Sequence, residues 1–407
     1  MEKRILLLIP YGGVGGMERL ALTFYNRMKK LGYNVKVVKL IKLETDIILF
    51  GDDEIYLSKK DFSEMSFIKR LLFYLSIPFK FRRIINKYKI TDSIGYGDMC
   101  NLFSSLSFTK ENKIASIHAL KSIELINKSP LNRIYEWAYK NTYRRFNKVV
   151  CISEAIKDDL IKKCGYGFPD NLKVIYNPHD VGYIQGLSTE NVMSESEEQI
   201  FKKNDVVVFL GRYSEQKAPW HLIRSFALVA DKNPNSHLVF IGSGDKGIYD
   251  DLIRLVEKYK INNKVSFFGQ KSNPYPYLKA AKVLALSSYY EGTPNVIIES
   301  IALETPIVST SCTKGIWELM CVDWENDFKE LIGSSCLVDS GYISPTLFRN
   351  TFSFDSNSEI LNGEKLFAEA VVNTINSTSD IIENIKKHKK KLLEKYEVDF
   401  VIDKYLQ

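Results

Sequence analysis

The chain has few of the features that mark secreted, metal-binding or membrane-spanning proteins. Its six cysteines form no C-x-x-C pair and show no regular spacing, which is typical of reduced thiols in a cytoplasmic protein. Its five histidines are scattered, and no two have the spacing of metal ligands. No stretch approaches the roughly 20 apolar residues of a membrane span, and the apolar run 5–10 is too short for a signal peptide. We therefore expect a cytoplasmic protein in which any membrane contact is peripheral.

The residues that are present follow the pattern of two α/β halves. An apolar run at 4–9, a glycine-rich loop at 10–16, a helical pattern at 17–31 and a second apolar run at 35–40 form one strand–loop–helix–strand unit. The same pattern starts again after a polar stretch at 180–205, which we interpret as a linker. A length of 407 residues also favours two domains. We predict two parallel-sheet domains that face each other, with the functional site between them.

Two glycine-rich loops follow predicted strands, where α/β sheets bind their ligands. The first has four glycines in the five residues 12–16. It is either a tight turn that needs positive φ or, as we favour, a backbone that approaches a ligand closely. It is not the dinucleotide-binding pattern, because Glu18 occupies the last glycine position. The second loop, 242–247, is a literal G-x-G-x-x-G, but the next strand end lacks the acid that binds ribose. We therefore expect no nicotinamide cofactor.

The stretch 287–310 has the residues that a sugar nucleotide needs. A helix is expected to begin near Asn295, and the free N–H groups of its first turn attract anions. Glu291 and Glu299 lie eight positions apart on either side of this start, where carboxylates can accept hydrogen bonds from sugar hydroxyls. The stretch therefore suggests a site for both the phosphates and the sugar of one ligand.

Three more candidate residues lie at the carboxyl ends of predicted strands. Arg212 and Lys217 fall in a strand-to-helix loop, where they either neutralise a diphosphate or are simply solvated cations. His118 follows another strand, and its role is either structural or functional.

The segment 66–90 is basic and apolar. Seven Lys or Arg and no acid occur between Lys69 and Lys89, interleaved with aromatic and isoleucine residues. We expect Pro78 to split the segment into two short helices. The pattern fits either an anionic membrane surface or a packed helix with a solvated basic face. No recognised nucleic-acid motif accompanies the charge, so we expect no nucleic-acid partner.

Four segments resemble motifs of the retaining GT-B glycosyltransferases of family 4, which build bacterial surface polysaccharides and glycolipids. Glu291 and Glu299 fit the E-x7-E motif of that family within EGTPNVIIESIALETPIVST, and FLGRYSEQKAPWHLIRSF resembles its G-R-x4-K phosphate segment. VIYNPHD and GGVGGMERL resemble its interdomain segment and its N-terminal glycine loop. The chain departs from the usual pattern at Ala218 and Glu304, where the family commonly has glycine, and at 313–318, a loop on the acceptor side.

The resemblance implies an α/β protein of the GT-B fold, in which two Rossmann-like domains face each other across an interdomain cleft. It implies an acceptor domain at 1–190, a nucleotide-sugar domain at 191–382, and a C-terminal helix at 383–407 that crosses back to the first domain. It also implies an enzyme, a hexosyltransferase that works without a metal and retains configuration; the chain has no D-x-D triplet.

The same resemblance assigns roles to individual residues. The residues implied in catalysis are His118, Glu291, Arg212 and Lys217. Those implied in donor binding are Gly13, Gly15, Gly16, Arg212, Lys217, Glu291, Asn295, Val296 and Glu299. Tyr11 and Glu18 are expected to bind the acceptor, and no residue is expected to bind a metal.

The implied reaction moves a hexose or N-acetylhexosamine from a UDP-sugar to a lipid-linked glycan during capsule, O-antigen or exopolysaccharide synthesis. The expected partners are the nucleotide sugar, the lipid-linked saccharide and an anionic membrane surface at 66–90, and no cofactor is expected beyond the donor. The protein would then be cytoplasmic or peripheral on the inner face of the plasma membrane. Two alternatives stay open: an epimerase or phosphorylase of the same fold, and a non-catalytic nucleotide-binding protein.

Overall fold

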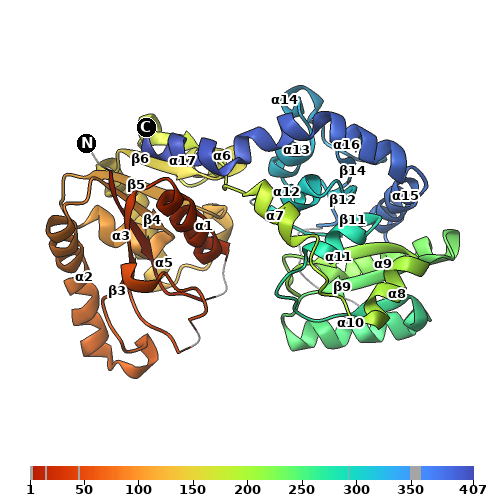
Figure 1. Ribbon diagram of the computed structural model, residues 1–407, viewed down its shortest axis with the longest axis horizontal. Coiled ribbons are helices and arrows are strands. Elements are labelled where there is room, and N and C mark those ends of the chain that lie inside the picture. The colour runs from red at the N-terminus through yellow and green to blue at the C-terminus, as the bar shows by residue number, and fades with distance from the viewer. Residues whose placement is uncertain (1–2, 14–15, 45, 292, 349–358) are drawn as a thin grey trace. The chain divides into compact units, whose positions relative to one another are not determined.

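The computed structural model describes residues 3–13, 16–44, 46–291, 293–348 and 359–407. The chain divides into two compact units, Met1–His179 with Lys395–Gln407, and Asp180–Glu394. Each unit has its own seven-stranded sheet (Figure 1). The sequence-based boundaries lay elsewhere, at 190 and 382. The helices next to those boundaries explain the difference. Helix α7 (Val181–Leu187) packs on α11 (Tyr275–Ala280) and α12 (Asn295–Ala302), and α16 (Thr378–Leu393) packs on α12, so α7 and α16 belong to the second unit.

The first unit is a parallel sheet covered by helices on both faces. Its strands follow the order β3-β2-β1-β4-β5-β6-β7, and every pairing is parallel. The strands are β1 (Arg4–Ile9), β2 (Asn34–Lys39), β3 (Glu54–Tyr56), β4 (Asp92–Tyr96), β5 (Asn112–Ile117), β6 (Lys148–Cys151) and β7 (Leu172–Val174). The helices are α1 (Gly16–Lys30), α2 (Phe67–Tyr88), α3 (Asp98–Ser105), α4 (Lys121–Glu124), α5 (Pro130–Asn141), α6 (Glu154–Lys162) and α17 (Val398–Leu406).

Alternate residues of β1 belong to two different hydrophobic cores. Leu6 and Leu8 pack with α2, α3 and α6 on one face, whereas Ile5, Leu7 and Ile9 pack with α1 and α17 on the other. A strand buried on both faces reads as a continuous apolar run, which is why RILLLI lacks alternation.

Helix α2 is continuous through Pro78, so the expected split into two short helices is wrong. Phe73, Ile77, Phe81 and Ile85 recur every four residues and are buried in the first core. A proline inside a helix costs about 3 kcal/mol, whereas each large apolar side chain contributes about 1.5–3 kcal/mol when buried. Four such side chains on one face outweigh the single proline.

The second unit repeats the architecture, with one antiparallel edge strand. Its order is β10-β9-β8-β11-β12-β14-β13, and only the β13–β14 pairing in the described part of this sheet is antiparallel. The strands are β8 (Asp205–Leu210), β9 (Ser236–Ile241), β10 (Val265–Phe267), β11 (Val283–Leu286), β12 (Ile307–Thr310), β13 (Cys336–Val338) and β14 (Gly341–Ser344). The remaining helices are α8 (Glu195–Lys203), α9 (Pro219–Lys232), α10 (Lys246–Lys258), α11 (Tyr275–Ala280), α12 (Asn295–Ala302), α13 (Lys314–Met320), α14 (Trp324–Asp327) and α15 (Asn362–Asn376).

The stretch 180–205 is more ordered than a linker. It contains α7 and α8, and each begins with a side-chain cap, Asp180 accepting from the Tyr183 N–H and Ser194 from the Glu197 N–H. These caps satisfy backbone donors that a polar composition would otherwise leave to water. The polar residues that suggested a linker are thus partly helix caps.

Candidate functional site

The loop between β8 and α9 brings Lys217 to Glu291. Lys217 Nζ lies 2.5 Å from Glu291 Oε1, and the two side chains are 16% and 5% exposed. The Ser287 hydroxyl donates to the carbonyls of Lys217 and Ala218, at 3.2 and 3.0 Å, and so ties this loop to the end of β11. Ala218 has φ of 41°, a left-handed conformation that favours glycine. Two residues that lie far apart in the sequence therefore form one charged pair.

Glu291 is held by three donors. Besides Lys217, its carboxylate accepts from the Ser288 hydroxyl at 2.6 Å and from the Gln216 amide at 3.4 Å. The Gln216 amide also donates to the carbonyl of Tyr290 at 3.1 Å. A buried carboxylate with this many donors keeps one orientation. It is suited to accept hydrogen bonds from a ligand rather than to attack it.

Helix α12 places the other predicted donor-binding residues. Asn295 begins the helix and Val296 follows it, while Glu299 lies one turn further, half-buried, and accepts from the Tyr275 hydroxyl at 3.4 Å. The Ile297 N–H is already used by the carbonyl of Pro294. The helix dipole gives this end a partial positive charge.

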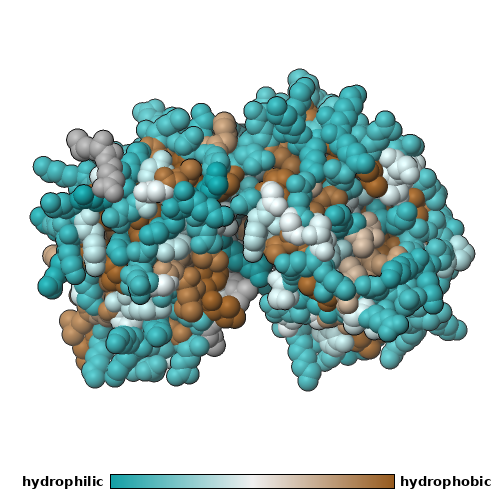
Figure 2. Space-filling model, viewed as in Figure 1, coloured by the Kyte–Doolittle hydropathy of each residue, from teal (hydrophilic) through white to brown (hydrophobic). Residues whose placement is uncertain are grey.

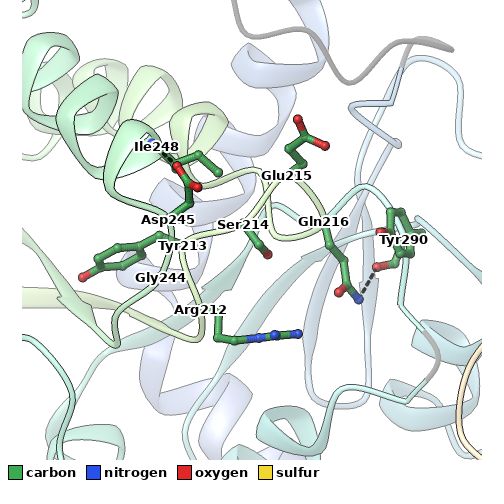
Figure 3. A pocket seen from close by; sticks show the side chains of 9 residues that line it. All are labelled: Arg212, Tyr213, Ser214, Glu215, Gln216, Gly244, Asp245, Ile248 and Tyr290. Carbon is green, nitrogen blue, oxygen red and sulfur yellow. Dashed lines mark hydrogen bonds between the residues drawn. The ribbon is translucent and has the colours of Figure 1, made fainter. Parts of the chain in front are cut away.

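A pocket of about 600 Å³ opens beside this site (Figure 3). It is lined by Arg212, Tyr213, Ser214, Glu215, Gln216, Gly244, Asp245, Ile248 and Tyr290. In Figure 3 the Arg212 guanidinium extends along the pocket below the Ser214–Gln216 backbone. The Asp245 carboxylate caps α10 by accepting from the Ile248 N–H at 3.0 Å, so its role there is structural. The pocket therefore combines one exposed cation with hydroxyl, amide and carboxylate groups, a mixture that fits a phosphorylated polyol.

Two glycines of the literal G-x-G-x-x-G are required by loop packing. A Cβ on Gly242 would lie 1.9 Å from the carbonyl oxygen of Gly211, and one on Gly244 would lie 2.3 Å from that of Tyr213. The β8–α9 and β9–α10 loops are therefore in backbone contact at these positions. This explains the glycines without a dinucleotide.

In the first unit, the predicted glycine loop is held by the segment that follows β2. The Gly12 N–H donates to Asp46 Oδ1 at 2.7 Å, and the N–H groups of Ile47 and Ile48 donate to its carbonyl. A Cβ on Gly12 would lie 2.6 Å from Lys39 Nζ, whereas a Cβ on Gly16 would have no atom of the described residues within 4 Å. Gly12 is thus a packing glycine, a Cβ on Gly13 would lie 3.4 Å from the Tyr11 ring, and Gly15 lies outside the described residues.

Tyr11 and Glu18 flank this loop and interact electrostatically. Glu18 is 3% exposed, and its burial, with a smaller contribution from Asp46, raises the pKa of its carboxyl. Tyr11 is 40% exposed, and partial burial and then the charge of Glu18 raise the pKa of its phenol.

His118 follows β5 and is neutral at physiological pH. Burial and then the charge of Lys121 lower the pKa of its imidazole to about 3. The ring stacks on Tyr96 with centroids 6.0 Å apart. Its Nε2 is buried and finds no hydrogen-bond partner among the described residues. A neutral imidazole with an unused nitrogen can exchange hydrogen bonds with a hydroxyl without adding charge.

The motifs did not single out the partners of the charged pair. Gln216, Ser288 and Tyr290 lie inside the segments that were read for Lys217 and Glu291, but no periodicity marks them. One signal was available, since Ser288 and Glu291 are three residues apart in a turn, a spacing at which side chains can meet.

Two negative observations apply to the residues that the structure describes. No group of three or more His, Cys, Asp or Glu side chains is placed to hold a metal ion. No helix in the same residues is both long and apolar enough to cross a bilayer.

Solved structures with this fold include glycosyltransferases. HepE from Anabaena, solved with UDP and glucose, superposes with a TM-score of 0.72 at 17% identity, covering 99% of this chain and 98% of that one. WaaG, a glycosyltransferase involved in lipopolysaccharide biosynthesis, gives a TM-score of 0.65 at 12% identity and 95% coverage of both chains. The two seven-stranded sheets and this likeness define the GT-B fold.

The sequence comparisons identify the family. Residues 14–183 match the family described as "Glycosyltransferase Family 4", and residues 193–326 match "Glycosyl transferases group 1". The chain belongs to these glycosyltransferases. An uncharacterized glycosyltransferase of Methanocaldococcus jannaschii is 28% identical over 82% of this chain and 81% of its own. The Campylobacter jejuni 4-alpha-N-acetylgalactosaminyltransferase that acts on N-acetylgalactosamine-N,N'-diacetylbacillosaminyl-diphospho-undecaprenol is 24% identical, over 75% and 80%.

Proposed function

We propose that the protein transfers a hexose or N-acetylhexosamine from a UDP-sugar to a lipid-linked glycan in surface polysaccharide synthesis. The observation that supports this most directly is the Lys217–Glu291 pair beside the pocket that Arg212 lines. Two cations beside an oriented carboxylate would suit the diphosphate and the sugar hydroxyls of such a donor. The Campylobacter relative, whose name specifies a diphospho-undecaprenol-linked acceptor, supports the choice of acceptor.

In the second unit, each charged residue has one proposed task. Arg212 and Lys217 bind the donor diphosphate and stabilise the negative charge that develops on UDP as the glycosidic bond breaks. The first turn of α12, at Asn295 and Val296, contributes N–H groups to the same phosphates. Glu299 accepts from the ribose hydroxyls and Glu291 from the hydroxyls of the transferred sugar.

In the first unit, the proposed contacts come from the glycine loop, from the end of β5 and from the residues that flank the loop. Gly13, Gly15 and Gly16 let the backbone approach the phosphates, His118 contacts the transferred sugar, and Tyr11 and Glu18 bind the acceptor.

The proposed chemistry needs neither a metal nor a carboxylate nucleophile. Two cations and a helix end supply the positive charge that a divalent ion supplies in other transferases. The acceptor hydroxyl attacks the anomeric carbon from the face that UDP leaves, and its proton passes to the departing phosphate oxygen. The configuration is then retained through a transition state with oxocarbenium character.

We also propose peripheral binding to an anionic membrane through α2. Six apolar side chains on this helix are between 48% and 74% exposed: Phe67, Ile68, Leu71, Leu72, Leu75 and Phe79. The same segment has seven Lys or Arg between 69 and 89 and no acid. Figure 2 shows hydrophobic residues gathered at the surface of this unit. Exposed apolar residues among cations are the combination that an anionic lipid surface binds.

A screen of nucleotides tests the proposed donor. UDP-sugars should raise the midpoint of thermal unfolding more than ADP- or GDP-sugars, because a ligand that binds only the folded state stabilises it. Arg212→Ala should remove most of this shift, whereas the exposed Lys232→Ala, at the far end of α9, should keep it. Equal shifts with all bases would contradict a UDP donor.

A further inference from the structure

A buried chain of side chains connects α15 to the loop that holds Glu291. Tyr289, His221, Glu364 and Arg224 are 5%, 5%, 0% and 2% exposed. His221 Nε2 lies 2.7 Å from the Tyr289 hydroxyl, and His221 Nδ1 lies 2.6 Å from Glu364 Oε1. Arg224 Nε lies 3.0 Å from the same carboxylate oxygen. None of these four residues belongs to the sugar-nucleotide site as described above.

The donors and acceptors in this chain fit only one direction. The Glu364 carboxylate accepts from Arg224 and from the Leu361 N–H, which donates to it at 2.6 Å. The tautomer that satisfies both contacts of His221 has its Nδ1–H directed at Glu364 and its Nε2 accepting from the Tyr289 hydroxyl. The Trp220 side chain in turn donates to the Tyr289 oxygen. The hydroxyl of Tyr289 is thus fixed by two neighbours.

The chain ends at the backbone of the site. The Tyr289 N–H donates to the carbonyl of Gln216 at 2.8 Å, and the Gln216 side chain holds the Tyr290 carbonyl and the Glu291 carboxylate. Tyr289 also lies between Ser288, a direct partner of Glu291, and the pocket residue Tyr290. A displacement of Tyr289 must therefore move the groups that orient Glu291.

We propose that Tyr289, His221 and Glu364 are positioning residues, which hold the 288–291 segment so that Glu291 meets the sugar of the donor. The part about the sugar rests on the proposed function. This relay of Tyr289, His221 and Glu364 contacts the residues around Glu291 and none of the proposed ribose contacts. Substitutions in the relay should therefore weaken binding of the donor sugar and leave binding of the nucleotide unchanged.

The test uses two mild substitutions and a matched control in the full-length protein. Tyr289→Phe removes only the hydroxyl, and His221→Asn keeps a donor toward Glu364 while withdrawing from Tyr289. The control is Tyr277→Phe, because Tyr277 is also buried in this unit and its hydroxyl lies 2.8 Å from Glu197, away from the relay. Hydrogen exchange at the amides of 288–291 is measured first, and the affinities for UDP and for the turned-over UDP-sugar second.

Hydrogen exchange at 288–291 should be faster than in the wild type in Tyr289→Phe and in His221→Asn. The exchange rate in Tyr277→Phe should equal that of the wild type. The proposal also predicts an affinity for the UDP-sugar that is about tenfold weaker in both relay variants, with an unchanged affinity for UDP. Unchanged exchange, or equal losses for UDP and the UDP-sugar, would overturn the proposal. If exchange rises but the wild-type protein turns over no UDP-sugar, the proposed function fails while the positioning of the segment stands.

Discussion

The Lys217–Glu291 pair joins two opposite charges at 2.5 Å in a region where both side chains are largely buried. Breaking a buried pair by removing one partner costs more than the pair contributes, because the remaining charge loses its compensation. Ser288 and Gln216 soften this cost for Glu291, since they still donate to it when Lys217 is absent. Removing the Lys217 cation should therefore leave the loop that contains Glu291 folded.

Lys217→Met should lower kcat by about 10²–10³-fold, the usual loss when one stabilising group for transition-state charge is removed. Circular dichroism should show a folded protein. Lys232→Met, at an exposed position on α9, should match the wild type in both measurements. A Lys217→Met protein that transfers sugar at the wild-type rate would remove Lys217 from the mechanism.

His118 should make the unfolding free energy depend on pH. Its folded pKa is about 3, below the 6.5 of a free histidine, so the unfolded chain binds the extra proton between these values. Its contribution to stability is complete above pH 6.5 and is lost as the pH falls toward 3. The NMR resonances of its imidazole should not titrate between pH 5 and 8. His118→Gln should flatten the decline in unfolding free energy below pH 6.5, and an unaltered decline would contradict the assignment.

Among the secondary-structure elements, the C-terminus of helix α12 is closed by Glu304, which adopts a left-handed backbone conformation that usually favours glycine. Glu304 has φ of 63°, its N–H donates to the carbonyl of Ile301, and the Thr305 N–H donates to that of Ser300. This is the double hydrogen bond of a Schellman motif, in which glycine is favoured at the left-handed position. Glu304 also pairs with Lys389 at 3.0 Å, a partly exposed contact of small value.

Glu304→Gly should therefore have an unfolding free energy about 1 kcal/mol higher than Glu304→Ala, because both lose the ion pair and only glycine avoids the left-handed penalty. The order should reverse at Glu369, which is exposed inside α15, where glycine costs about 1 kcal/mol relative to alanine. Urea denaturation of the four variants measures both differences. The same order at both positions would contradict the assignment.

Helix α2 is the element whose exposed face lacks an explanation from packing alone. Replacing Leu72 and Phe79, which are 61% and 74% exposed, with serine should weaken binding to anionic vesicles at least about tenfold, since each apolar side chain contributes about 1.5 kcal/mol or more when buried. Raising the salt concentration should weaken the wild type as well. Ile332→Ser, at an 83% exposed position in the other unit, is the control. If co-sedimentation with vesicles does not depend on lipid charge or salt concentration, the basic face of α2 is a solvated surface and not a membrane-binding one.

The sequence was a good guide where one physical rule dominated. Continuous apolar runs such as RILLLI located the buried parallel strands, and Arg212, Lys217 and Glu291 lie in loops that follow strands, as predicted. It failed where tertiary packing decided the outcome. The sequence around Pro78 predicted a break, but four buried side chains keep α2 continuous. The polar composition of 180–205 predicted a linker, but Asp180 and Ser194 in this stretch cap helices. The relay through Tyr289, His221 and Glu364 was invisible, because its members come from three separate segments.

At the scale of the whole molecule, the two units differ in how the chain builds them. The second is one continuous segment, 180–394, whereas the first needs its last helix from the far end of the chain. Val401, Ile402 and Tyr405 of α17 join the core beside α1, and the Tyr405 hydroxyl lies 2.9 Å from that of Ser116. Arg27 on α1 also pairs with Asp399.

A fragment of residues 180–394 should thus unfold cooperatively by itself and bind UDP. A fragment of residues 1–179 should be much less stable, because removing α17 uncovers the apolar face between α1 and the sheet. Adding a peptide of residues 395–407 in trans should restore part of its stability. Calorimetry of the fragments measures this, and a fully stable 1–179 fragment would show that α17 is dispensable.

The proposed transfer of a sugar from a UDP-linked donor to a lipid-linked glycan can be measured in a single assay. The protein is incubated with a panel of UDP-sugars and a polyprenyl-diphosphate-linked oligosaccharide, and the lipid fraction is analysed by mass spectrometry. We expect the acceptor to gain the mass of one sugar and one UDP to be released for each addition, and we expect Lys217→Met to lose most of both. A donor that is isomerised or hydrolysed while the acceptor keeps its mass, or transfer that survives Lys217→Met unchanged, would contradict the proposal.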